Sequence, residues 1–473
     1  MITPFANRAH NHNWKLDPII RSLLDLDFYK ILMAQFIWKL FSNTRVSFKL
    51  INRKKHIRLA DIIPRDRLVA QLDHVRTLRF LKSELIWLSG NTFYGTRGIF
   101  CPEFIEWLEE FKLPAYRLEE VDGQWELIFE GTWAQTTMWE IYALSIVNEL
   151  RTRAGLEKMT EFELDILYAH AKSKLWGKIK RLHGVPGLKI ADFGTRRRHS
   201  FLWQDYVVSL MKSELPDVFV GTSNAYMAYK HNLEAIGTNA HELPMVLAAL
   251  ARLGRLPGIG LKESQYEVLR LWKATYGGAM LVALPDTFGS TQFFRDAPNW
   301  VAEEFVGVRP DSKEPHAAIR EIIAFFEKNG QDARTKLAIP SDGLDVDSIL
   351  AIHAEFAGDV KPGFSAQSDF HDASDFLPPP SSDGNYSKWA YNPKIRLSYG
   401  WGTMLTNDFV NCHPRRQNDL DAFSLVCKVF EVEGHPAVKL SDNYLKATGP
   451  EGEIRVYRAE FGTDGVEGIE VTV

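Results

Sequence analysis

Three short polar motifs, each placed where an apolar run ends, constrain the fold of this chain more than any other feature. They run from Asp192 to Arg198, from Gly221 to Asn224 and from Gly237 to Glu242. Each follows a short strand-like run and precedes a helix-like one. Because repeated strand–turn–helix units carry their turns on one rim, hydroxyl groups, cations and His241 are expected there together. Glycine-rich turns at helix starts bind anions through backbone N–H groups, so the pattern predicts an enzyme site for a phosphate-bearing ligand.

The same rhythm continues well beyond these motifs. Helix-like segments separate most of the strand-like runs, and the clearest helix is predicted over 316–328, where Ile319, Ile322, Ile323 and Phe326 follow helical spacing. A (β/α) barrel with its chemistry at the carboxyl ends of the strands fits this order. A doubly wound open sheet gives the same local pattern and stays open as an alternative. The strand-like runs are 188–191, 218–220, 234–236, 279–284, 304–308, 335–339 and 395–398.

A chain of 473 residues exceeds the roughly 250–300 residues that one core usually supports, so more than one domain is expected. We predict an α/β fold with an N-terminal α/β domain over 1–150, an irregular (β/α) barrel over 151–410 and a β-rich segment over 411–473. In the first region, Asp27 is expected to cap a helix, and the remaining elements are a strand at 46–51, a hairpin at 115–121 and 124–129, and a helix at 134–154. In the last region, strand-like runs at 426–432, 454–459 and 469–473 are expected to pack back on the N-terminal domain. A stretch rich in Ser, Asp and Pro, 363–393, reads as a surface insertion.

Composition excludes several classes of protein. The net charge of −4 gives no overall reason to expect nucleic acid or an anionic membrane as a partner. The cysteines are three in number and scattered, which favours reduced thiols over disulfides or a cysteine-based zinc site. Residues 1–13 lack the apolar core of a signal peptide, and no run reaches the ~20 apolar residues of a membrane span. We therefore expect a soluble, cytoplasmic protein.

Chemistry-bearing residues recur just after the predicted strands. Glycine turns can cradle a phosphate, carboxylates can hold ribose hydroxyls or Mg²⁺, and arginine forks can grip carboxylate or pyrophosphate oxygens. Taken singly, each has a structural alternative: Arg196–Arg198 as a solvated turn, Asp345 as a helix cap and His353 as a core histidine. Their joint occurrence favours a site for a phosphorylated sugar. The residues are Phe193, Arg196, Ser223, Thr238, His241, Asp286, Arg309, Asp311, Gly343, Gly402 and Thr403.

These motifs, together with others along nearly the whole chain, resemble the nicotinate phosphoribosyltransferase family. The additional motifs are Leu24 to Lys30 with Met33 and Gln35, Glu130 to Trp133, Trp139-Glu140, Asp286-Thr287, Arg309 to Ser312, Ser341 to Asp345, Gly400 to Thr403 and Val438 to Asp442. The resemblance implies an N-terminal α/β domain joined to an irregular barrel, in a homodimer whose active sites are shared between subunits. Lys313-Glu314 departs from the Gly-Asp that the family usually has there, which puts the geometry of that loop in doubt.

The resemblance also implies a reaction. Nicotinate and 5-phosphoribosyl 1-pyrophosphate would give nicotinate mononucleotide and pyrophosphate in NAD biosynthesis, with Mg²⁺ present and ATP hydrolysis coupled through a phosphohistidine. That histidine corresponds to His241. Phe193 and Tyr29, the latter from the neighbouring subunit, would stack on the pyridine ring beside Arg196. Arg309 and Asp311 would hold phosphate and ribose, Gly343, Gly402 and Thr403 the 5′-phosphate, and Asp286 is the candidate metal ligand.

Three other readings are weighed against this one. The related nicotinamide-using enzyme carries an aspartate in the Gly-Thr turn, whereas this chain has Ser223, and a carboxylate there would repel the carboxylate of nicotinate. A barrel glycoside hydrolase needs two carboxylates about 5–10 Å apart around a neutral sugar, and the arginines and glycine turns argue against it. A non-enzymatic interaction module is disfavoured because His241 and the phosphate turns are intact.

Overall fold

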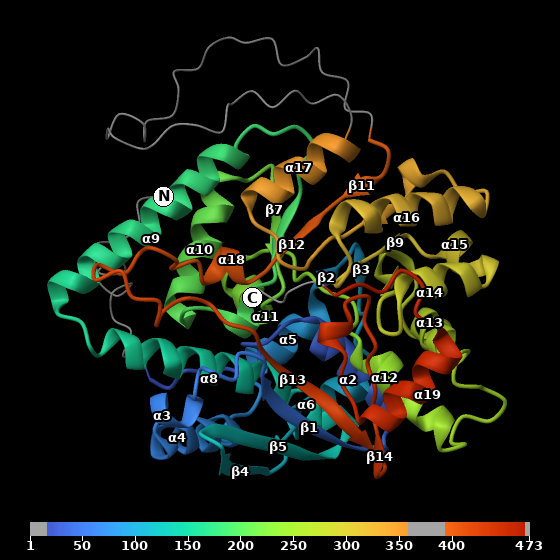
Figure 1. Ribbon diagram of the computed structural model, residues 1–473, viewed down its shortest axis with the longest axis horizontal. Coiled ribbons are helices and arrows are strands. Elements are labelled where there is room, and N and C mark those ends of the chain that lie inside the picture. Colours follow the sequence, from blue (N-terminus) through green and yellow to red (C-terminus); the bar gives the residue numbers. More distant parts are fainter. Residues whose placement is uncertain (1–16, 358–392, 469–473) are drawn as a thin grey trace, which may run out of the picture.

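The fold is known from a computed structural model that describes residues 17–357 and 393–468. It is a mixed α/β structure with an antiparallel sheet on one side and short parallel strands on the other (Figure 1). The predicted strands at 469–473 and residues 363–392 of the predicted insertion lie outside the described residues. Among the described residues, no helix has both the length and the apolar character that crossing a membrane requires.

The antiparallel sheet joins the two ends of the described chain. Its strand order is β14-β13-β1-β5-β4. Phe48 and Leu50 of β1 lie opposite Val429 and Cys427 of β13, and all four side chains are buried. The expected return of the C-terminal segment to the N-terminal region is thus confirmed. The strands are β1 (Arg45–Asn52), β4 (Tyr116–Val121), β5 (Gln124–Thr132), β13 (Leu425–Val432) and β14 (His435–Pro436), with a separate hairpin of β2 (Thr92–Phe93) and β3 (Thr96–Arg97).

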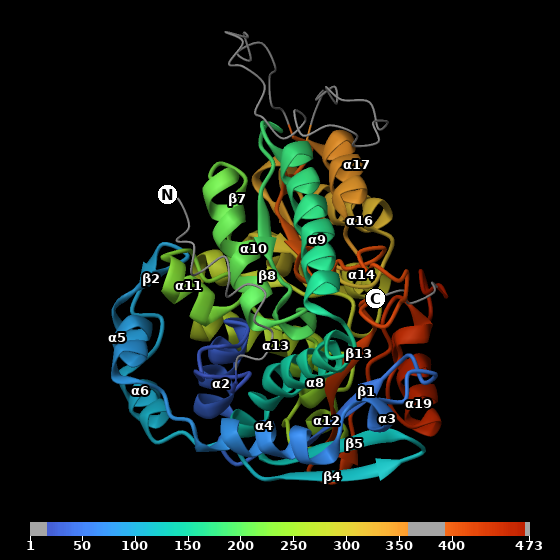
Figure 2. The same ribbon diagram turned by 90° about the vertical axis from the view of Figure 1, so that its left-hand side faces the viewer.

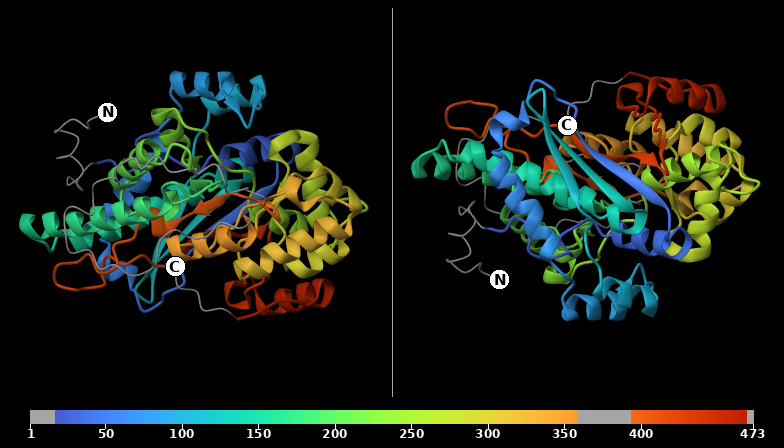
Figure 3. Two further views of the ribbon diagram at one scale, coloured as in Figure 1. Left: turned by 90° about the horizontal axis from the view of Figure 1, so that it is seen from above. Right: turned by 90° about the horizontal axis from the view of Figure 1, so that it is seen from below.

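The helices α5 and α6 lie at one edge of the molecule, apart from the antiparallel sheet, in two perpendicular views (Figures 2 and 3). Helix α8 is buried along nearly all of its length; most of its residues are apolar or small, and its buried charged side chains have partners, such as Glu149 with Arg153. The helices are α2 (Tyr29–Leu40), α3 (Leu59–Ile62), α4 (Arg65–Thr77), α5 (Lys82–Gly90), α6 (Pro102–Glu109), α7 (Trp133–Thr136), α8 (Trp139–Leu156) and α9 (Glu161–Leu182).

The parallel strands form two sheets that meet at one short segment. One has the order β12-β6-β7 and the other β11-β10-β9-β8, and only Ser398 separates β11 from β12. Ala235 extends the first sheet by a bridge to Thr222. No strand pairing between described residues connects β8 to this bridge, so a closed ring is not formed by the pairings. The strands are β6 (Ile190–Asp192), β7 (Phe219–Thr222), β8 (Val282–Ala283), β9 (Gly307–Val308), β10 (Leu337–Ala338), β11 (Arg396–Leu397) and β12 (Tyr399–Trp401).

Helices follow most of these strands, as the sequence predicted. Helix α16 matches the predicted helix over 316–328, and Asp345 caps α17 by accepting a hydrogen bond from Ser348 N at 2.8 Å. His353 is a buried core histidine bonded to Pro186 O at 2.9 Å. The helices are α10 (Phe201–Glu214), α11 (Ala225–His231), α12 (Glu242–Arg252), α13 (Ser264–Thr275), α14 (Ser290–Asp296), α15 (Asn299–Glu304), α16 (Pro315–Lys328), α17 (Val346–Phe356), α18 (Thr403–Thr406) and α19 (Glu451–Phe461).

Two local predictions are wrong. Residues 454–459 form part of α19 instead of a strand, because Tyr457 and Phe461 are buried at i and i+4 against Phe288 while Glu451 and Glu453 favour a helix start. Asp27 does not cap α2. Phe28 occupies the cap position without a side-chain bond, and the Asp27 carboxylate points instead to Ser223.

A buried ion pair fastens the N-terminal segment to the first parallel sheet. Arg198, which has no exposed surface, donates two hydrogen bonds of 2.7 Å to the two carboxylate oxygens of Asp25. Asn224, after β7, donates a third at 2.8 Å to Oδ1. Backbone bonds run alongside, from Phe28 N to Ser223 O and from Ala225 N to Leu26 O. The turns after β6 and β7 are therefore held by the chain that leads into α2.

Removing one partner of this pair should be costly. We expect Asp25→Ala to lower the free energy of unfolding by about 3–5 kcal/mol, because the Arg198 charge stays buried without its partner. The exposed pair of Arg58 and Asp61 provides the control, and Asp61→Ala should cost at most about 1 kcal/mol. Urea denaturation of the two variants checks this. Equal losses would contradict the role given to the buried pair.

Candidate functional site

The turn after β6 is built by buried polar contacts. Asp192 has no exposed surface; its carboxylate accepts hydrogen bonds from Gly194 N at 2.7 Å, Thr222 Oγ1 at 2.7 Å and Gln204 Nε2 at 2.9 Å. Helix α8 supports the turn from the other side, where Ser145 Oγ donates to Thr195 O and Asn148 Nδ2 to Arg196 O. The turn is thereby fixed from the elements on either side of it.

The ring of Phe193 lies against Gly400 of β12. A Cβ atom at Gly400 would approach the ring to 2.4 Å, so only glycine leaves room for it. Phe193 N also donates to Trp401 O at 2.8 Å. Phe193 is half-buried, which leaves part of its ring available to a ligand. The two turns therefore depend on each other for their shape.

The arginine triplet does not act as one cluster. Arg198 is committed to Asp25, as described above, so it has no role in binding an external anion. Arg196 is partly exposed and has its Nε 3.3 Å from Asp27 Oδ2 and its Nη1 3.9 Å from Glu140 Oε1. Arg197 forms no ion pair with another described residue, and burial together with the neighbouring Arg196 charge lowers its pKa to about 10. Two of the three arginines can therefore face a ligand.

Ser223 faces a carboxylate rather than an open pocket. Its Oγ donates a hydrogen bond of 2.6 Å to Asp27 Oδ1. The other oxygen, Oδ2, is buried without a hydrogen-bond donor among the described residues. Burial raises the pKa of Asp27, and Arg196 and Ser223 counter that effect. A carboxylate of the chain itself, that of Asp27, therefore lies directly beside Ser223.

Tyr29 reaches this region within its own chain. Its Cβ lies 3.1 Å from where a Cβ at Gly237 would sit, so the residue packs on the Gly237-Thr238 turn. Burial raises the pKa of Tyr29, with Glu140, Arg196 and Asp27 close enough to act on it electrostatically. Tyr29 is thus within electrostatic reach of Arg196 of the same chain, and the sharing of this ring between subunits stays a prediction. Thr238 is buried in the same turn.

His241 stands immediately before α12 with a carboxylate on each side. Its Nε2 lies 3.0 Å from Asp286 Oδ1, and its Nδ1 lies 3.8 Å from Asp311 Oδ2. Burial lowers the pKa of His241 to about 4, although Asp286 acts in the opposite direction. The imidazole is therefore neutral at neutral pH.

Asp286 determines which nitrogen of His241 carries the proton. Burial alone would raise the pKa of Asp286, but His241, Lys439 and the 2.5 Å hydrogen bond from Ser312 Oγ hold it well below its usual range. An ionised carboxylate only accepts hydrogen bonds, so the proton of the neutral imidazole lies on Nε2. The lone pair on Nδ1 then faces the side of Asp311.

Arg309 and Asp311 form the neighbouring part of the rim. Arg309 Nη1 lies 3.4 Å from Asp311 Oδ1, and its Nη2 donates to Asn239 O at 3.1 Å. Asp311 Oδ1 also accepts from Ser341 Oγ at 3.0 Å. His241, Asp286 and Asp311 each offer one ligand atom within 4.8 Å of the others. Two carboxylates suit Mg²⁺, which prefers oxygen ligands, whereas the histidine nitrogen does not.

The predicted phosphate turns lie at the ends of β10 and β12. Gly343 has φ of +62°, the left-handed region that favours glycine, and precedes the cap of α17. Gly402 stands immediately before α18, whose first residue is Thr403. The two turns approach each other through Gly400 N, which donates to Pro340 O at 3.1 Å.

Sequence reasoning missed three cations that come from the antiparallel sheet and the tail. Arg53 follows β1, Lys428 lies on β13, and Lys439 lies 3.9 Å from Asp286 Oδ2. Burial lowers the pKa of each, and all three are within electrostatic reach of Asp311. We call Arg53, Arg197, Lys428 and Lys439 the cation set. Apart from the Lys439 contact, its members pair with no carboxylate among the described residues, so the set can take an anionic ligand.

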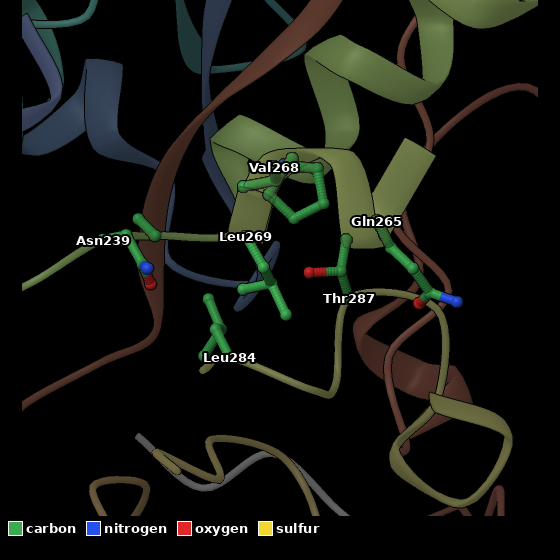
Figure 4. A pocket seen from close by; sticks show the side chains of 8 residues that line it. Asn239, Gln265, Val268, Leu269, Leu284 and Thr287 are labelled. Atoms are coloured by element: carbon green, nitrogen blue, oxygen red, sulfur yellow. The ribbon is translucent and has the colours of Figure 1, made fainter. Parts of the chain in front are cut away.

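A small pocket lies beside this region but holds none of its chemistry. It is mostly apolar, and its polar side chains are Asn239, Gln265 and Thr287 (Figure 4). Asn239 Oδ1 and Thr287 Oγ1 have no hydrogen-bond partner among the described residues. None of the candidate residues named above lines it. The lining residues are Asn239, Ala240, Pro244, Gln265, Val268, Leu269, Leu284 and Thr287.

Comparison with known proteins places the chain in a family. The model of the nicotinate phosphoribosyltransferase (NAPRTase) family matches residues 188–366 and 384–464, and that of the family's N-terminal domain matches residues 24–148. The chain belongs to the nicotinate phosphoribosyltransferase family. This agrees with the motifs from which the resemblance was recognised.

Solved structures with these names share the fold. A nicotinate phosphoribosyltransferase from Vibrio cholerae is 28% identical, with a TM-score of 0.76 over 95% of each chain. The enzyme from Porphyromonas gingivalis is 24% identical, with a TM-score of 0.74 over 94% of this chain and 100% of that one. A putative one from Saccharomyces cerevisiae is 23% identical, with a TM-score of 0.74 over 95% and 99%.

The contact between Ser223 and Asp27 leads us to predict how the stability of Ser223 variants depends on pH. When folding raises the pKa of an acidic group, the folded state favours the protonated form. The free energy of unfolding then falls as the pH rises above the pKa that the group has in the unfolded chain. Ser223→Asp should enlarge this effect by placing a second carboxylate against Asp27. Relative to Ser223→Asn, we expect it to lose about 1–3 kcal/mol more at pH 8 than at pH 5. Thermal unfolding at both pH values measures this, and a difference independent of pH would contradict it.

Proposed function

We propose that this protein transfers the phosphoribosyl group of 5-phosphoribosyl 1-pyrophosphate to nicotinate, giving nicotinate mononucleotide and pyrophosphate for NAD biosynthesis. The observation that carries the proposal is the cation set beside Asp311 and Arg309, next to a neutral His241. Cations without carboxylate partners bind phosphates strongly, and a carboxylate beside them can hold ribose hydroxyls or a metal. Family membership supports the same activity.

The pyridine substrate is assigned to the end of the site that holds Arg196. Phe193 and Tyr29 would stack on its ring, and Arg196 would attract its carboxylate, with Ser223 and Thr238 nearby. The ring nitrogen would attack the anomeric carbon of the ribose, forming the C–N bond as the C–O bond to pyrophosphate breaks and pyrophosphate leaves with the electron pair. Such a reaction passes through an oxocarbenium-like state, so the protein acts mainly by orienting groups and neutralising charge.

The phosphates are assigned to the rest of the rim. Arg309 and the cation set would neutralise the pyrophosphate, while Gly343, Gly402 and Thr403 would cradle the 5′-phosphate and Asp311 would hold the ribose. Asp311 and Asp286 would hold Mg²⁺, which supplies charge neutralisation of the leaving group when bound. Both oxygens of Asp286 already accept hydrogen bonds, from His241 and Ser312, so Asp311 is the more available ligand.

ATP hydrolysis is coupled to this reaction through a phosphohistidine at His241. A neutral imidazole is a competent phosphoryl acceptor, and the proton on Nε2 leaves the Nδ1 lone pair free to attack the γ-phosphate. The Nδ1–P bond would form as the P–O bond to ADP breaks, with ADP leaving with the electron pair. Water would later take the phosphoryl group from Nδ1 and release inorganic phosphate. Asp286 would stabilise the positive charge that develops on the ring. The reaction would take place in the cytoplasm, which the three unpaired cysteines support.

The competing functions find less support in these contacts. A glycoside hydrolase needs one carboxylic acid free to protonate the leaving group, whereas Asp286 is held ionised between His241 and Ser312. Release of pyrophosphate that requires both nicotinate and 5-phosphoribosyl 1-pyrophosphate separates the two activities. Hydrolysis of a neutral glycoside without pyrophosphate release would overturn the proposal.

The role of His241 is tested by substitution. We expect His241→Asn to abolish phosphate transfer from labelled ATP to the protein, while slow synthesis of the mononucleotide without ATP remains. His353→Asn is the control, because His353 is bonded to Pro186 O and should leave labelling in place. Peptide mapping of the label in the unaltered protein should locate it on His241. Labelling of the His241→Asn variant would overturn the assignment.

The protein is expected to be a homodimer, but each chain should carry its own complete pyridine end, because Tyr29 lies beside Arg196 of the same chain. Mixing a Tyr29→Ala chain with a His241→Asn chain should therefore restore no ATP-coupled activity, even after subunit exchange is verified. A site shared between subunits predicts recovery of up to about a quarter, since half of the dimers would be mixed and each would hold one intact site. Recovery at that level would contradict the placement of Tyr29.

A further inference from the structure

Lys30 is a fully buried lysine at the meeting point of three helices. It lies on α2 and has no exposed surface. Its Nζ lies 2.6 Å from Glu140 Oε2 on α8, 2.6 Å from Glu242 Oε2 on α12 and 3.0 Å from Thr137 Oγ1. The three ammonium protons thus have three acceptors. Burial alone would lower the pKa of Lys30, but Glu140 and Glu242 outweigh it and keep the group charged.

The two carboxylates lead to opposite ends of the candidate site. Glu242 follows His241 directly, and its second oxygen accepts a 2.5 Å hydrogen bond from Trp133 Nε1. Glu140 has its Oε1 3.9 Å from Arg196 Nη1, and Arg196 lies 3.3 Å from Asp27. Successive contacts between charges of opposite sign therefore connect five residues, in the order Asp27, Arg196, Glu140, Lys30 and Glu242.

We propose that Lys30 is a positioning residue that transmits the charge state of His241 to Arg196 through Glu140. The inference rests on the proposed function. A phosphoryl group brings about −1.5 to −2 charges, and on His241 it would stand one residue along the chain from Glu242, whose carboxylate contacts Lys30. The ammonium would then be drawn toward α12 and away from Glu140, which would tighten the hold of Glu140 on Arg196. The pyridine end would in this way respond to phosphorylation without touching the phosphate.

The test separates coupling from activity by counting ATP molecules hydrolysed per mononucleotide formed. Glu140→Gln keeps the size of the side chain but removes the charge that links Lys30 to Arg196. We expect this variant to keep phosphate labelling of His241, while the ratio of ATP to product rises at least about threefold. A residue with only a structural role would lower both rates together and leave the ratio unchanged.

Glu149→Gln is the matched control. Glu149 is also buried, accepts from Arg153 Nη2 at 3.0 Å, and lies on the same helix, so its loss should leave the ratio as in the unaltered protein. Should Glu140→Gln fold poorly, the double variant Lys30→Met/Glu140→Gln, which removes one charge of each sign, should show the same rise in the ratio. An unchanged ratio in the folded variant overturns the inference alone. Synthesis by the unaltered protein without any ATP hydrolysis would instead overturn the proposed coupling, and the inference with it.

Discussion

The buried pair of Asp25 and Arg198 is the interaction on which the rest of the site depends. It joins the segment before α2 to the turns after β6 and β7, and both side chains are buried. Burying two charges costs free energy, which good geometry and further hydrogen bonds must offset. Asn224 and Gln204 supply those bonds. The pair fixes the position of the residues that follow Asp25. Asp27 and Tyr29 come two and four residues later, so anchoring Asp25 places both near Arg196.

At the other end of the site, around His241, burial favours a neutral side chain instead of a charged pair. Desolvation keeps His241 neutral, and the ionised Asp286 fixes its proton on Nε2. Cations gather around the same place because strands from both ends of the chain pass it, and burial lowers the pKa of Lys428 and Lys439. An anionic ligand would restore the charge balance that these cations lack.

The sequence predicted the parts of the structure that depend on local pattern. Turns such as Gly237-Thr238 follow their strands at fixed spacing, so the rim could be recognised, and α16 could be placed from its apolar stripe. The parts that depend on long-range contacts could not be predicted. Arg198 and Arg196 look alike in sequence, yet only Asp25, far away along the chain, makes one of them structural. In sequence, Lys428 looks like an ordinary solvent-facing lysine that alternates with the buried residues of β13. Only the pairing of β13 with β1 brings it near Asp311. The apolar residues of α19 fit a strand and a helix alike until Phe288 is placed beside them.

We propose that Arg196 is the residue that makes this site select a pyridine carboxylate. It is tested most directly by measuring kcat/KM for nicotinate and for nicotinamide with the same purified protein and saturating 5-phosphoribosyl 1-pyrophosphate. A carboxylate that pairs with this partly exposed arginine should be favoured by at least about a hundredfold, or roughly 2.7 kcal/mol. Equal or better use of nicotinamide would show that Arg196 does not select the carboxylate.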